Sequence, residues 1–337
     1  MASDYAMQAK ARSMYAKHLT LEQYQKMTSF KDVPSIAAYL KNDARYKAVL
    51  SSIDENNIHR ETLEKHVRLL GQMEFLKLMR FVKLGRTNFY QYYVKRREIE
   101  QILYVIHSID SNVPYKMDAY IGKLNDLMGL DIHLLSQMRS FEQLQTYLDT
   151  TSYKGVFQLP KHGEPVDISD LEASLSHHYR EYVQTLIKKE PNYHEIQKLF
   201  DMDDELKMIE YVYRLKKNYH LQPDKIMGRI AYRPYFISIS QMKQWVNQYD
   251  AEAFIEAFNH SAYKRYMSGR NFVSIETYLN VIRYRIYEHH FRFATNTNLT
   301  LMSYLELVRY EIKNVIDIVE GVRYGMSPDT ILSFITI

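Results

Sequence analysis

Two landmarks recur along this chain with almost the same period. The first is a Tyr-Lys pair that follows a short amphipathic segment, with its tyrosine at Tyr46, Tyr153 and Tyr263. The second is a glutamate early in a longer apolar segment, at Glu98, Glu205 and Glu311. Successive tyrosines are 107 and 110 residues apart, and successive glutamates are 107 and 106 apart. The tyrosines precede the glutamates by 52, 52 and 48 residues, so two independent landmarks keep a nearly constant offset.

This period predicts the domain organisation. A Tyr-Lys pair alone means little, because the chain has 30 Tyr and also contains Tyr115-Lys116. The combination of two landmarks and their offset is what indicates a repeated unit. A period near 107 exceeds the roughly 20 to 50 residues of a solenoid repeat and matches a small domain. We therefore predict three similar helical domains from internal triplication, at 1–108, 109–220 and 221–337.

The apolar pattern predicts an all-α fold. Segments such as "IEQILYVIHSI" and "IKNVIDIVEGV" place apolar residues three and four apart, which gives a helix one buried stripe. Glycine and proline are scarce, at 10 and 8 residues, as expected for helices joined by short connections. Helix starts are indicated by Thr20 with Gln23, Ser169 with Glu172, and Ser327 before Pro328. Only in 221–235 do we expect a short extended piece.

No motif in the sequence indicates catalysis, a cofactor or a metal. The chain has no cysteine, no G-x-x-x-x-G-K-[ST] phosphate loop and no G-x-S-x-G nucleophile motif. The histidine clusters His177-His178 and His289-His290 are adjacent pairs, which point about 100° apart on a helix and rarely share one metal ion. We interpret the lone G-x-x-x-G of Gly321 and Gly325 as a helix C-cap or a close helix contact.

Positive charge is concentrated in the first third of the chain. Residues 1–108 hold 18 Lys/Arg against 11 Asp/Glu, whereas the remaining residues hold 26 against 29. The stretch "FLKLMRFVKLGR" contributes Lys77, Arg80, Lys83 and Arg86. It is either a solvated helix face or a surface for an acidic partner. Nucleic acid is a less favoured partner, because the tyrosines lie in amphipathic helical segments.

The C-terminal stretch "YLELVRYEIKNVIDIVEGVRYGMSPDTI" (304–331) is the most specific passage of the sequence. Its Arg309, Glu311 and Asn314, followed by the two glycines, resemble the closing signature of the C subunit of V-type (A/V-type) ATPases, which corresponds to the d subunit of the eukaryotic enzyme. The opening residues 5–50 are similar to the family's N-terminal pattern. The first copy repeats the signature as Arg96, Glu98 and Gln101, whereas the middle copy departs from it, with Asp203 and Met208 around Glu205.

The resemblance implies a funnel-shaped, all-helical protein of three similar domains around a pseudo-threefold axis. Such a protein would sit on the cytoplasmic face of the membrane, between the proteolipid ring and the central stalk. It would transmit torque that couples ATP hydrolysis or synthesis to H⁺ or Na⁺ transport, with no nucleotide or cofactor and no transmembrane segment of its own. The basic first third would then face acidic proteolipid loops, anionic lipid headgroups or the stalk.

Two interpretations of the signature residues remain open. Each glutamate lies early in an amphipathic helix, where a carboxylate beside an arginine can brace the domain, and we favour this role over direct contact with a partner. Two alternatives to the rotor socket also remain, a helical-repeat adaptor unrelated to ATPases and an enzyme whose site has no recognisable motif.

Overall fold

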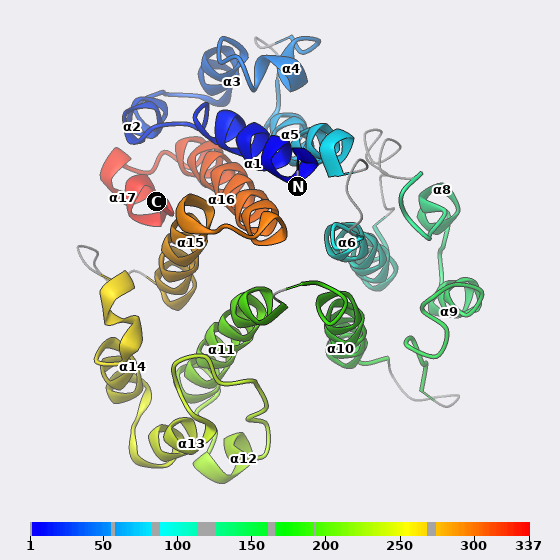
Figure 1. Ribbon diagram of the computed structural model, residues 1–337, viewed down its shortest axis with the longest axis vertical. Helices are drawn as coiled ribbons and strands as arrows, with labels where there is room; N and C mark the ends of the chain where they lie inside the picture. Colours follow the sequence, from blue (N-terminus) through cyan, green and yellow to red (C-terminus); the bar gives the residue numbers. More distant parts are fainter. Residues whose placement is uncertain are drawn as a thin grey trace. The chain divides into compact units, whose positions relative to one another are not determined.

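The computed structural model describes residues 2–54, 58–82, 88–113, 126–160, 166–191, 193–267 and 274–337 (Figure 1). Throughout these ranges the regular secondary structure is helical and no strand occurs, which confirms the all-α prediction. The prediction of a short extended piece in 221–235 is wrong. Helix α12 (Pro223–Met227) begins there, and the residues after it are irregular.

The chain forms two compact units. One is continuous and consists of Val82–Tyr193, whereas the other combines Met1–Phe81 with His194–Ile337. The second unit is therefore built from both ends of the sequence. These divisions lie at other residues than the predicted boundaries of 108 and 220, and the triplication itself stays a prediction.

The continuous unit is built on two long helices that pack together, α6 (Gln91–Ser111) and α10 (Ile168–Ile187). Two short helices, α8 (Ile132–Ser136) and α9 (Phe141–Leu148), complete its described part. Its core includes Ile102 and Ile106 of α6, Leu144 and Leu148 of α9, and Leu175 of α10. Because these side chains come from segments within one stretch of the chain, this unit has a core of its own.

The first part of the discontinuous unit contains five helices within residues 2–82. They are α1 (Ala2–Tyr15), α2 (Leu21–Thr28), α3 (Val33–Lys41), α4 (Lys47–Leu50) and α5 (Arg60–Val82). Thr20 and Gln23 form the predicted capping box at the start of α2, in which each side chain accepts from the other residue's backbone N–H.

The second part is His194–Ile337, and its first helix begins one residue earlier. Its helices are α11 (Tyr193–Lys217), α12, α13 (Ile239–Gln248), α14 (Ala251–Asn259), η2 (Ala262–Tyr266), α15 (Ile275–Phe293), α16 (Thr297–Arg323) and α17 (Pro328–Phe334). Helix α16 is buried along most of its length and packs against α15 and α17, and also against α1, α2 and α3 (Figure 1). The first and last segments of the sequence therefore lie side by side.

The helix ends test three further expectations. Ser327 accepts from the N–H of Thr330 and caps α17, as predicted. Helix α10 begins at Ile168, so Ser169 is a helical residue rather than the predicted N-cap. Gly325 has a φ of +66° just beyond α16, and a Cβ on Gly321 would lie 2.5 Å from Cγ1 of Ile331, so the glycine pair serves both as a helix end and as a close helix contact.

Candidate functional site

The two sequence landmarks meet in the structure. The hydroxyl of each tyrosine donates to the carboxylate of one glutamate, in the pairs Tyr153–Glu98 at 2.9 Å, Tyr263–Glu205 at 2.8 Å and Tyr46–Glu311 at 2.9 Å. The three tyrosines are fully buried, and the glutamates are at most 4% exposed. Burial raises the pKa of each tyrosine hydroxyl, which therefore keeps its proton and acts as a donor.

The pairs connect neighbouring copies of the sequence repeat. Glu98 and Glu205 bind the tyrosines that follow them, 55 and 58 residues later. Glu311 has no following Tyr-Lys pair, and it binds the first one, at Tyr46, 265 residues earlier. Each contact therefore joins the helix that carries a glutamate to the next Tyr-Lys pair. The third contact joins the two ends of the chain.

Glu98 is neutralised by a lysine on its own helix. Lys95 Nζ lies 3.4 Å from Glu98 Oε2, donates to Ser152 Oγ at 2.8 Å and sits 3.7 Å from the centre of the Tyr153 ring. Burial lowers the pKa of Lys95, while the charge of Glu98 acts in the opposite direction. The backbone N–H of Gly129 donates to the other oxygen, Glu98 Oε1.

Glu205 instead receives backbone donors. Oε2 accepts from the N–H groups of Tyr235 and Ile237 at 2.7 and 3.1 Å, and Oε1 accepts from Phe236 at 3.1 Å. Burial raises the pKa of the Glu205 carboxyl, and the three amide donors oppose that shift. This carboxylate therefore fixes the irregular segment before α13 against α11.

Glu311 is held by side chains from the beginning of the chain. Arg45 Nη1 donates to Oε1 at 2.6 Å, His18 Nδ1 lies 2.8 Å from Oε2, and the N–H of Leu19 donates to Oε2 at 3.1 Å. Burial would raise the pKa of Glu311, but His18 and Arg45 together lower it to about 2. The carboxylate is thus ionised and joins α16 to the segments after α1 and α3.

A second carboxylate extends this cluster. Arg45 Nε and Nη2 donate to the two oxygens of Glu74, at 2.8 and 3.0 Å, in the bidentate geometry that favours arginine. Tyr304 of α16 donates to Glu74 Oε2 at 2.5 Å. Buried charges require such compensation, because an unpaired one costs several kcal/mol, on the order of 3 to 5.

A family model described as "ATP synthase (C/AC39) subunit" matches residues 7–334. The chain belongs to this family. The resemblance to the V-type ATPase family is thereby confirmed over almost the whole sequence. No match was found among curated proteins.

The remaining signature positions of this ATP synthase (C/AC39) subunit have structural neighbours. Asn314 exchanges two hydrogen bonds of 2.8 Å with the backbone of Thr336, which ties the C-terminal residues to α16. Arg309 Nε lies 2.7 Å from Glu306, and Arg96 Nε lies 3.5 Å from Glu100. Gln101 is buried on α6. These contacts lie within one chain, and the choice between bracing and contact with a partner stays a prediction.

Sequence reasoning missed several members of the buried clusters, namely His18, Arg45, Glu74, Lys95 and Tyr304. Arg45 immediately precedes Tyr46, but the corresponding residues before the other tyrosines are Ser152 and Ala262, so the repeat gave no signal for it. Lys95 stands in the sequence "KRRE" (95–98), a charged run that by itself indicates a solvated surface. Glu98 and Glu311 take their cations from different places in the sequence and Glu205 uses backbone amides instead, and such differences produce no periodic pattern.

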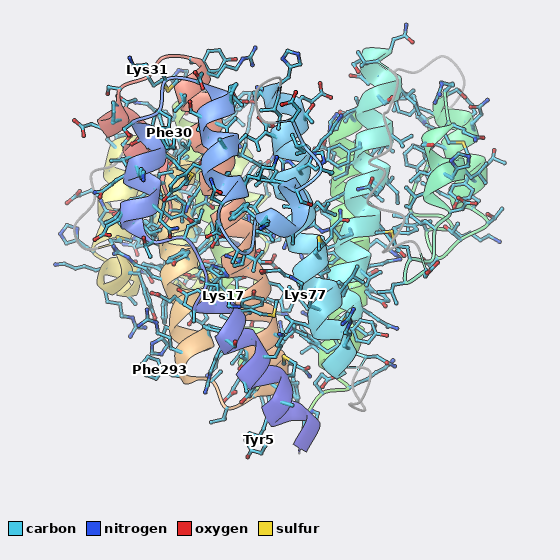
Figure 2. All side chains as sticks on the ribbon, turned by 90° about the horizontal axis from the view of Figure 1, so that it is seen from above. Tyr5, Lys17, Phe30, Lys31, Lys77 and Phe293 are labelled. Carbon is cyan, nitrogen blue, oxygen red and sulfur yellow. The ribbon has the colours of Figure 1, made fainter. Side chains whose placement is uncertain are left out.

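The basic segment of the family member is described only in part. Lys77 is half-buried and Arg80 is exposed on α5, whereas Lys83 and Arg86 lie outside the described residues (Figure 2). Helix α5 is antiparallel to α16, because Arg60 pairs with Glu320 and Glu74 with Tyr304. Arg80 therefore lies toward the start of α16. Tyr5 and Phe293, each 70% exposed, lie at that end of the unit, opposite Phe30 and Lys31 (Figure 2).

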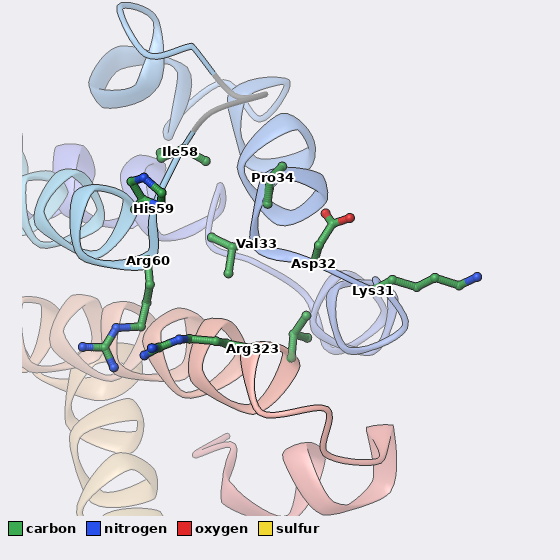
Figure 3. Close-up of a pocket in the computed structure, with 9 residues that line it drawn as sticks. Lys31, Asp32, Val33, Pro34, Ile58, His59, Arg60 and Arg323 are labelled. Carbon is green, nitrogen blue, oxygen red and sulfur yellow. The ribbon is translucent and has the colours of Figure 1, made fainter.

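A pocket of about 450 Å³ lies at the other end of α16 (Figure 3). Its walls include Val33 and Pro34 from the start of α3, Arg60 from the start of α5, and Val322 and Arg323 from the end of α16. Arg60 is paired with Glu320 and with Glu64, the latter at 3.2 Å, so its charge is balanced within the wall.

Metal binding and membrane insertion each place requirements on the side chains and helices of the described residues. Among these residues, no group of three or more His, Asp or Glu side chains is placed to hold a metal ion. Within the same ranges, no helix combines the length and apolar character needed to cross a bilayer.

Proposed function

We propose that this protein is a non-catalytic rotor socket of a V-type ATPase or ATP synthase. It would link the central stalk to the membrane proteolipid ring at the cytoplasmic face. In that position it would transmit the torque that couples ATP hydrolysis or synthesis to H⁺ or Na⁺ transport. The proposal rests on membership of the ATP synthase (C/AC39) subunit family over residues 7–334.

The buried clamp around Glu311 supports a role in transmitting torque. A part that carries torque must resist relative movement of its segments, and packed helices joined by satisfied buried charges deform little. In the discontinuous unit, Arg45 bridges Glu74 and Glu311, so that α5 and α16 are held by the same guanidinium group. Sliding of these helices past each other would separate buried opposite charges. The free-energy cost of that separation strongly opposes the movement.

The ends of α16 are candidate docking sites for the two neighbours in the complex. One end carries the exposed aromatic side chains Tyr5 and Phe293, with Arg80 exposed on α5. Exposed large aromatic residues near basic groups are common at protein interfaces. We propose that Lys77 and Arg80 face an acidic neighbour at this end, as part of a basic segment that continues in the sequence with Lys83 and Arg86.

The test is purification of the complex from its native membranes, followed by native mass spectrometry. The expected result is co-purification of the chain with a proteolipid ring and a stalk subunit, without ATPase activity of the isolated chain. Purification of an intact rotary complex that lacks the chain would overturn the proposal.

A charge-reversed variant tests the basic segment separately. Changing Lys77, Arg80, Lys83 and Arg86 to Glu should reduce coupling of ATP hydrolysis to ion transport while the chain remains folded. Fully retained assembly and coupling would remove the basic segment from the proposal but leave the socket role intact. Family membership argues against the alternative of an adaptor unrelated to ATPases.

A further inference from the structure

The segment between α12 and α13 is held rigidly although it has no regular structure. Glu205 binds three consecutive backbone amides, from Tyr235 to Ile237. Tyr232 closes the segment on itself by donating its hydroxyl to the carbonyl of Ile237 at 2.8 Å. The Phe236 ring packs 5.0 Å from the ring of Tyr263, whose hydroxyl binds the same carboxylate. An irregular segment with this many contacts presents its outward side chains in fixed positions.

Four exposed cations surround this segment, and we call them the basic loop surface: Arg229, Arg233, Lys264 and Arg265. Arg229 donates to the hydroxyl of Tyr211 on α11 at 2.9 Å. Burial raises the pKa of Asp201 on α11, and the nearby charge of Arg233 opposes that shift. The guanidinium of Arg265 lies 4.8 Å from the centre of the Phe236 ring. These contacts place the basic loop surface along α11, around the amides that Glu205 holds.

The cations of the basic loop surface form no close ion pairs, and Asp201 interacts with Arg233 only from a longer distance. Among the described residues, none of its four cations has a carboxylate oxygen within 4.0 Å. Three cations of the neighbouring helix α11 are paired by contrast, Lys207 with Asp203 at 2.8 Å, Arg214 with Glu210 at 3.0 Å, and Lys217 with Glu252. Unpaired positive charge on a rigid surface favours an acidic partner and accelerates its association.

We propose that the basic loop surface binds an acidic protein surface with clustered Asp and Glu side chains. Three of its four cations are arginines, whose planar guanidinium groups bind carboxylates in bidentate geometry. Residues 223–238 and 262–267 contribute none of the large apolar side chains exposed on the described chain. The exposed ring beside them, Tyr211 on α11, binds Arg229 through its hydroxyl, so this surface offers little apolar area for insertion into a membrane. Tyr263 is fully buried, and the half-buried Phe236 ring packs against both Tyr263 and Arg265, so neither ring is an open stacking platform for single-stranded nucleic acid.

This inference goes beyond the proposed socket role and does not require it, since it concerns the chemistry of a partner. The three buried glutamates differ in their donors. Glu98 and Glu311 each have a cation and a single amide donor beside them, whereas Glu205 binds three consecutive amides of one irregular segment.

The experiment measures the affinity of the full chain for fluorescent poly-L-glutamate by anisotropy. The test variant is Arg229→Glu with Arg233→Glu, and the matched control is Lys188→Glu with Lys189→Glu. Both control lysines are exposed in the other compact unit, and both double variants lower the net charge equally. Lys264→Glu is compared with Lys47→Glu and Lys154→Glu, which occupy the same position in the other Tyr-Lys pairs.

The Arg229/Arg233 variant should lose about tenfold or more in affinity, and the control less than about twofold. Lys264→Glu should weaken binding more than its two counterparts do. Equal losses in test and control variants, or no binding by the unaltered chain, would overturn the proposal. Phosphatidylglycerol vesicles and duplex DNA are measured in parallel. Binding of either that depends on Arg229 and Arg233, without binding of poly-L-glutamate, would equally contradict it. None of these outcomes bears on co-purification with the ring and stalk.

Discussion

At Glu205 one carboxylate satisfies three backbone amides, so its replacement by glutamine has a local and measurable effect. The Glu205→Gln side chain keeps one acceptor but puts an NH₂ group against amide donors that need the other. We expect faster hydrogen exchange at residues 235–237 and a loss of about 1–3 kcal/mol in the free energy of unfolding. Exchange mass spectrometry measures the first and urea unfolding the second.

Glu210→Gln is the matched control, because Glu210 lies on the same helix but pairs with Arg214 rather than with the segment. It should leave exchange at 235–237 unchanged. If Glu205→Gln also leaves that exchange unchanged, the carboxylate does not hold the segment.

The pKa of Glu311 makes the stability of the discontinuous unit depend on pH. Its folded pKa of about 2 lies below the ordinary value of 4.5, because His18 and Arg45 stabilise the ionised form by more than burial disfavours it. The stabilisation is fully present above the unfolded pKa and is lost as pH falls from about 4.5 toward 2. A shift of this size corresponds to about 3 kcal/mol. Glu205, whose pKa is raised, contributes in the opposite direction.

Urea unfolding of the unaltered chain and of Glu311→Gln, between pH 6 and pH 3, checks this expectation. The unaltered chain should be more stable at pH 6, and its advantage should shrink as pH falls. An advantage that is constant over this range would show that ionisation of Glu311 does not contribute.

At the scale of helices, the contact between α16 and α17 depends on the absence of a side chain at Gly321. A Cβ there would lie 2.5 Å from Cγ1 and 2.9 Å from Cδ1 of Ile331, which is fully buried. Gly321→Ala should therefore lower the free energy of unfolding by about 1–3 kcal/mol. Gly228→Ala is the control, since a Cβ there meets nothing within 4 Å.

A double-mutant cycle with Ile331→Ala separates this clash from a general effect of alanine. The Gly321→Ala substitution should cost much less in the Ile331→Ala background, because the contacting atoms are gone. Equal costs in both backgrounds would mean that α17 does not press on Gly321.

The helices were largely predictable from the sequence, but the partners of the landmarks were not. The cap at Thr20 and the glycine pair follow from local chemistry, which the sequence contains in full. The offset from a tyrosine to the next glutamate is close to the offset from a glutamate to the next tyrosine, so spacing could not decide which two meet. The donors to Glu205 are backbone amides, which any residue supplies, and so no side-chain pattern reveals them.

At the scale of the whole molecule, the two compact units differ in how they depend on the chain. The core of Val82–Tyr193 draws on residues between Ile99 and Leu175, all inside that stretch. In the other unit, Arg45 and Tyr46 need Glu311, and Glu74 needs Tyr304, so the buried polar groups of the first part are satisfied by the last part. Neither part can satisfy these groups alone.

Fragments of the chain test this difference. Residues 82–193 expressed alone should show helical circular dichroism, cooperative urea unfolding and resistance to proteolysis. Residues 1–81 alone should remain largely unfolded, because burial of Arg45 and Tyr46 without Glu311, and of Glu74 without Tyr304, is unfavourable. Addition of residues 194–337 should restore helicity. The fragment 1–81 with Arg45→Leu should associate more weakly, since both carboxylates would then be buried without that cation. Independent folding of 1–81 would show that its core does not need the C-terminal helices. The contacts of Glu311 with the first part of the chain would then not be what holds this unit together.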